Sequence, residues 1–76
     1  MNRQRRDCLK NAAALLDRAA DIISSVCDAE NESYDNLPES FQDGDLGEKM
    51  ESAIDSLEEA INSIEEAKEA IEHASE

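Results

Sequence analysis

The sequence predicts an all-α protein: an antiparallel two-helix hairpin, coiled-coil-like, that pairs with a second copy into a four-helix bundle. Two observations predict it. Between Ala53 and His73 the chain repeats every seven residues, as AIDSLEE, AINSIEE and AKEAIEH, and a seven-residue apolar period is typical of helices packed along their length. The 76 residues include only two Gly and one Pro, which favours long helices. We therefore expect one helical-hairpin domain over residues 1–76.

The first helix is expected from about residue 3 to about residue 33. Apolar residues at alternating spacings of three and four form a seam: Leu9, Ala12, Leu16, Ala19, Ile23 and Val26. Rows on both sides widen it: Cys8, Leu15, Ile22 and Ala29 on one, and Ala13, Ala20 and Cys27 on the other. One partner helix cannot cover so broad a stripe, so the pattern favours a bundle of three or more helices.

A connection is expected from about residue 34 to about residue 45. Its segment NLPE predicts a short helical turn, with Asn36 as the N-cap and Glu39 bonding back to it. Asp45 and Glu48 repeat this capping pattern at the start of the second helix. Apolar and aromatic side chains are expected to cover the end of the bundle: Tyr34, Leu37 and Phe41.

The second helix is expected from about residue 46 to about residue 74. Its seam holds large apolar residues: Met50, Ile54, Leu57, Ile61, Ile64 and Ile71. Lys68 interrupts the seam, either as a snorkelling side chain or as a device that sets the register of an oligomer. A row of small residues beside the seam lets another helix approach closely: Ala53, Ala60, Ala67 and Ala74. Helices of matched length joined by one connection fold back as an antiparallel hairpin.

A single copy has few large apolar residues and no Trp. Such a thin core favours self-association, so we expect a homodimer. The expected oligomer interface combines the flanking row of the first helix with the small-residue row of the second: Leu15, Ile22, Ala53, Ala60 and Ala67.

Charge is distributed unequally along the chain, whose formal net charge is −13. Residues 1–18 carry a net charge of +3 and residues 19–76 a net charge of −16. In an antiparallel hairpin we expect the basic side chains of the start (Arg3, Arg5, Arg6 and Lys10) to pair with the acids of the finish. The negative charge argues against direct binding to nucleic acid or to a membrane surface. It favours a protein partner with a basic surface.

No cofactor, metal or catalytic site is expected, and we predict that the chain is not an enzyme. The acids of residues 43–48 depart from the calcium-loop pattern, and His73 has no partner motif. Cys8 and Cys27 are too far apart on one helix to form a disulfide, which predicts reduced thiols. Reduced thiols and the lack of a signal-peptide core predict a cytoplasmic protein.

An acidic side of the second helix is the strongest candidate for a binding site. We expect its carboxylates to bind the partner: Glu51, Asp55, Glu58, Glu59, Glu65, Glu66, Glu69 and Glu72. Neighbouring charges are roughly 5–6 Å apart, a spacing of the same order as that of phosphates along a nucleic-acid strand. The helix would then imitate a phosphate track. The alternative is a solvated helix side that keeps a small protein soluble.

The stretch from Tyr34 to Ala67 resembles a family of short acidic helical proteins of Firmicutes phages and mobile elements that lack an assigned function. The most specific part is YDNLPESF at residues 34–41, followed by GEKM at residues 47–50. The resemblance implies a mobile-element origin, and with it the cytoplasm of a bacterial host cell as the location. It implies no mechanism and transfers no functional residue.

Together these patterns predict a phage or mobile-element protein that acts by protein–protein binding. The leading hypothesis is an inhibitor of a host defence nuclease, or of another nucleic-acid-binding protein, through nucleic-acid mimicry. Two alternatives stay open: a structural oligomerisation or adaptor module that offers an apolar groove to a partner helix, and a phage assembly factor without mimicry.

Overall fold

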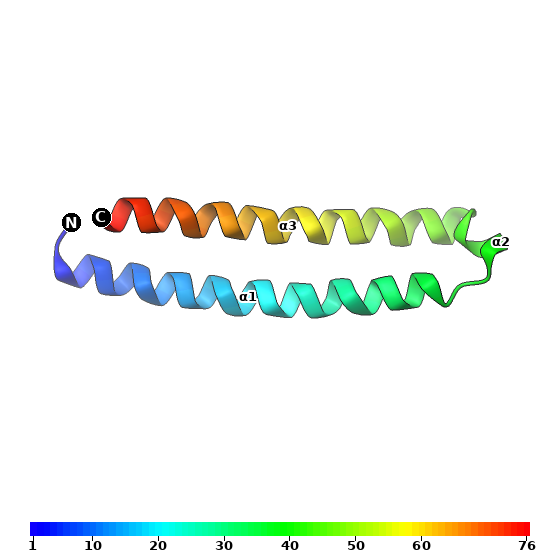
Figure 1. Cartoon of the computed structure of the whole chain (residues 1–76), viewed down its shortest axis with the longest axis horizontal. Coiled ribbons are helices and arrows are strands. Elements are labelled where there is room, and N and C mark those ends of the chain that lie inside the picture. The colour runs from blue at the N-terminus through cyan, green and yellow to red at the C-terminus, as the bar shows by residue number, and fades with distance from the viewer.

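A computed structural model describes all 76 residues and shows two long helices that lie side by side in opposite directions (Figure 1). Helix α1 spans Arg3–Asp35, the one-turn helix α2 spans Glu39–Gln42, and α3 spans Asp45–Ser75. The prediction of an all-α antiparallel hairpin is confirmed. The radius of gyration is 17.2 Å, against roughly 11 Å for a compact domain of this length, so the molecule is a rod.

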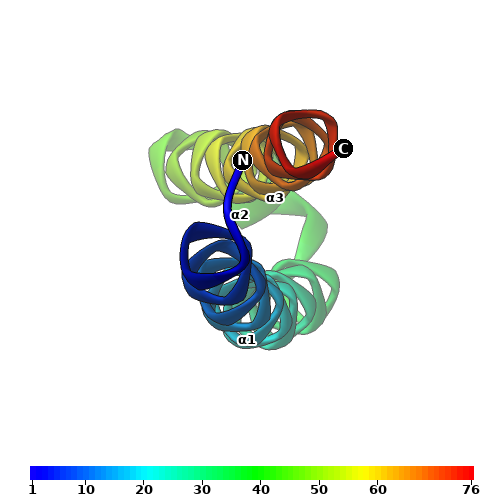
Figure 2. The same ribbon diagram turned by 90° about the vertical axis from the view of Figure 1, so that its left-hand side faces the viewer.

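The end-on view in Figure 2 shows that α1 and α3 cross each other rather than running strictly parallel. Such a crossing is expected when side chains with a seven-residue period stay in contact along both helices. Both chain termini lie at one end of the rod and α2 lies at the other (Figure 1). No helix combines the length and the apolar character that a membrane span needs.

The N-cap of α1 is Asn2, whose side-chain oxygen accepts a hydrogen bond from the backbone N–H of Arg5 at 2.8 Å. The C-cap is Asn36, whose backbone N–H donates to the carbonyl of Glu32 at 3.1 Å. The prediction that Asn36 caps the following turn is therefore wrong. Pro38 stands at that N-cap without a side-chain hydrogen bond. Asn36 cannot serve there because it is the C-cap of α1, with its backbone in the αR region.

The capping pattern predicted for α3 is also absent. Asp45 is already the first helical residue, and the N-cap is Gly44, which makes no side-chain cap bond. The first turn is closed instead by the N–H of Glu48, which donates to the carbonyl of Gly44 at 3.0 Å. Asp45 and Glu48 both lie in this first turn, where negative side chains interact favourably with the helix dipole.

The connection closes over the end of the hairpin through Gln42 and Gly47. The side-chain amide of Gln42 donates to the carbonyls of Tyr34 and Leu37, at 3.0 and 3.1 Å. Gly47 is buried, and a Cβ added there would lie 2.0 Å from the carbonyl oxygen of Gln42. Phe41 was expected to cover this end, but it is 55% exposed. Adjacent helical residues point about 100° apart, so Phe41 faces away when Gln42 turns its side chain toward the carbonyls of Tyr34 and Leu37.

The core is a thin seam between α1 and α3. Only Cys27 and Ile54 are buried hydrophobic residues, at 6% and 8% exposed. The expected seam of α3 is confirmed, since its large apolar residues and Lys68 are all buried or half-buried. On α1 the position expected for Val26 is taken by Cys27, and Val26 itself is 48% exposed. The contact stripe of α1 therefore includes the row of Ala13, Ala20 and Cys27.

Candidate functional site

Two contacts across the seam define the register between α1 and α3: an ion pair between Asp17 and Lys68, and a hydrogen bond of 2.5 Å that the Tyr34 hydroxyl donates to Glu51. Between these contacts, the charge of Glu58 acts on the thiol of Cys27. In each pair the two residue numbers add up to 85. Residue i of α1 therefore lies level with residue 85 − i of α3, and the two heptad patterns stay in step from Asp17 to Tyr34.

Lys68, Cys27 and Tyr34 in the seam are each close to an acid of α1 and to an acid of α3. The flanking acids are Asp17 and Glu65 at Lys68, Asp28 and Glu58 at Cys27, and Asp35 and Glu51 at Tyr34. Acids from both helices thus lie on the same side of the seam. Sequence reasoning placed the candidate site on the second helix alone, and the structure adds a second acidic row from α1.

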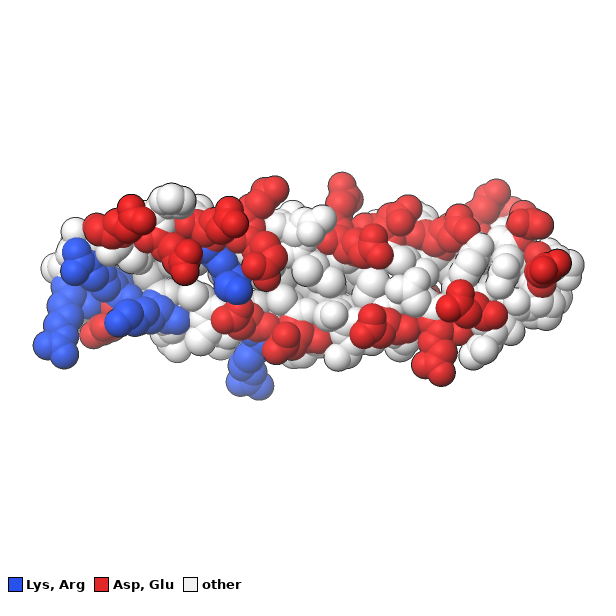
Figure 3. Space-filling model, in the orientation of Figure 1, with Lys and Arg blue, Asp and Glu red and all other residues white.

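We call this surface the acidic face. It comprises Asp17, Asp21, Asp28 and Asp35 of α1, with Glu51, Asp55, Glu58, Glu65, Glu69 and Glu72 of α3. Figure 3 shows acidic side chains along both helices and basic side chains gathered at the end where the termini lie. The row of α1 was missed in the sequence, although Asp21, Asp28 and Asp35 share a seven-residue spacing. Sequence alone did not show which side of α1 would lie beside the acids of α3.

Most of this negative charge is unpaired. Lys68 forms an ion pair with Asp17 and a longer one with Glu65 at 3.7 Å. The only other ion pair joins His73 to Glu76 at 3.9 Å, and it requires a protonated histidine. The expected pairing between the basic start and the acidic finish is not seen within 4.0 Å, because the long side chains there reach into solvent. Every acid of the acidic face is exposed.

Hydrogen bonds, burial and the nearby acids shift the pKa values of three seam residues, with a net rise in each. The hydrogen bond to Glu51 raises the pKa of Tyr34 above 10.0, and burial and the nearby acids raise it further. The hydrogen bond to Asp17 raises the pKa of Lys68 above 10.5, against a smaller lowering by burial. Burial, with the charges of Glu58 and Asp28, raises the pKa of the Cys27 thiol above 9.0. All three shifts favour the protonated form.

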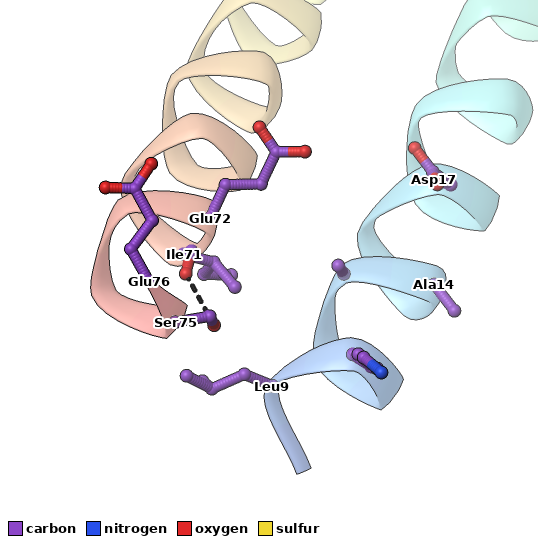
Figure 4. Close-up of a pocket in the computed structure, with 9 residues that line it drawn as sticks. Leu9, Ala14, Asp17, Ile71, Glu72, Ser75 and Glu76 are labelled. Carbon is purple, nitrogen blue, oxygen red and sulfur yellow. Dashed lines mark hydrogen bonds between the residues drawn. The ribbon is translucent and has the colours of Figure 1, made fainter. Parts of the chain in front are cut away.

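A hollow of about 450 Å³ opens between α1 and α3 on the acidic face, close to the termini (Figure 4). Leu9 and Ile71 point into the space between the helices, and Asp17 and Glu72 lie across it from each other. The hydroxyl of Ser75 donates to the carbonyl of Ile71 at 2.9 Å, so it is not directed at a ligand. Lys10 also lines the hollow, on the α1 side, against three carboxylates from Asp17, Glu72 and Glu76. The aliphatic floor and this excess of carboxylates suit the stem and charged head of a Lys or Arg side chain.

The remaining predicted site residues lie on other surfaces. Glu59 and Glu66 are exposed on the outer side of α3, in a heptad row away from α1. Leu15 and Ile22 are 58% and 62% exposed. Of the expected interface alanines, Ala53 and Ala67 are exposed and Ala60 is half-buried. No group of three or more His, Cys, Asp or Glu side chains is arranged to hold a metal ion.

Comparisons with protein-family models, with curated proteins and with solved structures find no match to this chain. The functional proposal therefore depends on the charges, contacts and exposed surfaces of this chain alone. The acidic face carries both the unpaired negative charges and the hollow described above.

Proposed function

We propose that this chain is a binding protein rather than an enzyme, and that its acidic face occupies a basic, nucleic-acid-binding surface of another protein. The observation that carries the proposal is the convergence of acids from α1 and α3 at Lys68, Cys27 and Tyr34. Most of the carboxylates on this face have no cation of their own chain to neutralise them. A basic partner would remove this repulsion and gain Coulomb energy.

The spacing of the charges supports mimicry of a nucleic acid. Acids three or four residues apart on a helix are separated by roughly 5–6 Å. Two packed helices have axes about 8–10 Å apart, so the acidic face presents two charged rows rather than one. Both rows stand on long helices held in register, which orients the charges before a partner arrives and lowers the entropic cost of binding.

The hollow beside the termini supplies a specific contact on this surface. A Lys or Arg side chain of the partner would lay its aliphatic stem on Leu9 and Ile71 and its charge between Asp17 and Glu72. Residues that bind phosphate in nucleic-acid-binding proteins are mainly Lys and Arg. The same side chains that hold phosphate would therefore enter the hollow.

The resemblance of residues 34–67 to phage and mobile-element proteins gives the proposal a biological setting. In that setting the partner is a nuclease, or another nucleic-acid-binding protein, of a bacterial defence system. The chain would inhibit it by competing with DNA or RNA. Association would be fast at low salt and would slow steeply as ionic strength rises.

The test compares two variants of equal net charge. The first changes four acids of the acidic face to amides: Asp55→Asn, Glu58→Gln, Glu65→Gln and Glu69→Gln. The control changes four acids on other surfaces: Glu32→Gln, Glu39→Gln, Glu59→Gln and Glu66→Gln. Both raise the net charge from −13 to −9. The readout is displacement of a short DNA duplex from purified bacterial defence nucleases, measured across a salt series.

We expect the first variant to displace DNA at least about tenfold less well at low salt, with a weaker salt dependence. The control should stay close to the wild type. Equal losses in both variants would show that only total charge matters and would contradict a defined face. Failure of the wild type to displace DNA from any nuclease would remove the mimicry proposal.

A further inference from the structure

The side of the hairpin opposite the acidic face is apolar along both helices. On α1 it carries a row of residues spaced by seven together with Val26, and on α3 a second row spaced by seven. We call it the apolar face, formed by Cys8, Leu15, Ile22, Val26 and Ala29 of α1, with Leu46, Ala53, Ala60, Ala67 and Ala74 of α3. The large members are all about half exposed or more: Leu15 58%, Ile22 62%, Val26 48% and Leu46 51%.

Both rows lie on one side of the molecule because of the register described above. At about 100° per residue, the α3 row lies roughly half a turn away from Glu51, Glu58 and Glu65. On α1, Val26 is also roughly half a turn away from Asp28, and the row that contains Ile22 is roughly a third of a turn away from it. Since the acids of both helices share one face, the apolar rows share the other. The hairpin thus leaves a two-helix-wide apolar surface uncovered, which is unusual for a chain that functions as a monomer.

The exposed surface area indicates how much a partner would cover. The accessible surface is 5749 Å², about 1,100 Å² more than the roughly 4,600 Å² expected of a compact monomer of 8.4 kDa. The row from Cys8 to Ala29 is about 32 Å long, and the hairpin is 15 Å across. That strip has a projected area of roughly 500 Å² per copy, so a pair of copies would bury roughly 1,000 Å², the lower limit for a specific interface.

We propose that a second copy of this chain covers the apolar face, with the two-fold axis parallel to the helices. In this four-helix bundle α1 of each copy packs on α3 of its partner. Rotation about such an axis keeps every residue at its own level along the rod. Residue i in the row of large side chains on α1 therefore lies at the same height along the rod as residue 85 − i of the partner's α3.

The two rows are complementary at those levels. Leu15 is level with residue 70, so it enters between Ala67 and Ala74 of the partner subunit. Ile22 is level with residue 63, between Ala60 and Ala67 of the partner subunit. Ala29 is level with residue 56, between Ala53 and Ala60 of the partner subunit. Large side chains that fall midway between small ones are the knobs-into-holes arrangement of packed helices.

Charge favours the same arrangement. Helix α1 carries seven acids and five basic residues, a net charge of −2, whereas α3 carries ten acids and two lysines, a net charge of −8. Packing α1 on the partner's α3 keeps the two most negative helices diagonally apart. A two-fold axis perpendicular to the helices would instead place α3 on α3 and α1 on α1. That arrangement would place like charges opposite each other. It would also pack the row of large side chains on its own copy and the row of small side chains on its own copy.

The first test measures mass by light scattering and sedimentation equilibrium from micromolar to millimolar concentration. The wild type should be a dimer of about 17 kDa, twice the chain mass. The double variant Leu15→Glu, Ile22→Glu should weaken the dimer at least about 100-fold, because four charges would be buried without partners. The matched control Asn11→Glu, Ser25→Glu adds the same charges on the outer side of α1 and should stay dimeric.

The second test measures the orientation of the two copies. A spin label is attached at Ser40→Cys in a Cys8→Ser, Cys27→Ala background, and the distance between labels is measured by pulsed electron resonance. The proposed axis places both connections at one end, with labels roughly 20–30 Å apart across the bundle. The perpendicular axis would separate them by most of the 58 Å length.

Three results would overturn the proposal: a monomer throughout the concentration range, an assembly larger than a dimer, or a long label distance. A monomer that gains helix only with a foreign amphipathic peptide would assign the apolar face to an adaptor role instead. These outcomes are separable from a failure of mimicry, since the amide variants alter only the acidic face and other surfaces outside the apolar one.

Discussion

The two halves of the rod are held together differently. At the connection end, Ile54 and Cys27 are buried, and Gln42 and Gly47 pack the one-turn helix against the start of α3. At the terminal end α1 offers mainly alanines, an open hollow lies between the helices, and the seam includes Lys68. Apolar burial therefore stabilises one half, while the other keeps a polar contact and a space for a ligand.

The largest difference between the halves is expected from truncation of one large seam residue in each. Ile54→Ala should lower the free energy of unfolding by about 3 kcal/mol, because it leaves a cavity among buried neighbours. Ile71→Ala should cost about 1 kcal/mol or less, since Ile71 lines the open hollow and is half-buried. Urea unfolding followed by circular dichroism measures both values at one protein concentration. Equal costs would contradict the comparison.

A smaller effect is expected from Gly47→Ala at the connection end. The added Cβ would lie 2.0 Å from the backbone oxygen of Gln42, so α2 must move away from α3. Overpacking of this kind costs about 1–3 kcal/mol, and the better helix propensity of Ala returns up to about 1 kcal/mol. Amide hydrogen exchange should show loss of protection confined to residues 37–48. Unchanged protection there would show that α2 accommodates the methyl group without moving.

At the terminal end, Lys68→Met should change stability little and in the favourable direction. The ion pair with Asp17 is partly exposed, with 27% of the Lys68 side chain and 58% of the Asp17 side chain accessible, and exposed pairs contribute little. A methionine would continue the apolar seam. The midpoint of thermal unfolding should rise by a few degrees at most, with Asp17→Asn as the control for loss of the ion pair. A large fall would show that Lys68 holds the register.

The smallest expected effect is a loss of stability in alkali that involves both halves. The folded-state pKa values of Cys27, Tyr34 and Lys68 are raised above their ordinary values of 9.0, 10.0 and 10.5. The folded chain therefore holds these protons more tightly than the unfolded chain does. Their contribution is complete below pH 9 and is lost as pH rises through the folded-state pKa values. Thermal melts from pH 8 to pH 11 should show the decline, and Tyr34→Phe should reduce it.

Sequence patterns predicted the seam of α3 correctly because the large apolar residues of its central part, Ile54, Leu57, Ile61 and Ile64, all lie along one side of the helix. On α1 the stripe was too broad, and periodicity alone did not distinguish Val26 from Cys27. The roles of Gln42 and Gly47 depend on contact between segments that only the folded chain brings together. The same holds for the acidic row of α1, because which side of α1 adjoins the acids of α3 is a property of the hairpin.

The fixed level relation between α1 and α3 makes the rod divisible into matched segments. A seven-residue piece of α1 and the piece of α3 at the same level form one module, and removing both leaves the modules on either side in contact as before. Removing seven residues from one helix alone would shift, by two turns, every pair that lies farther from the connection than the deletion. The molecule can therefore be lengthened or shortened by inserting or deleting seven residues in both helices at the same level. Such a change would alter the length of its charged rows and keep the other contacts between the helices.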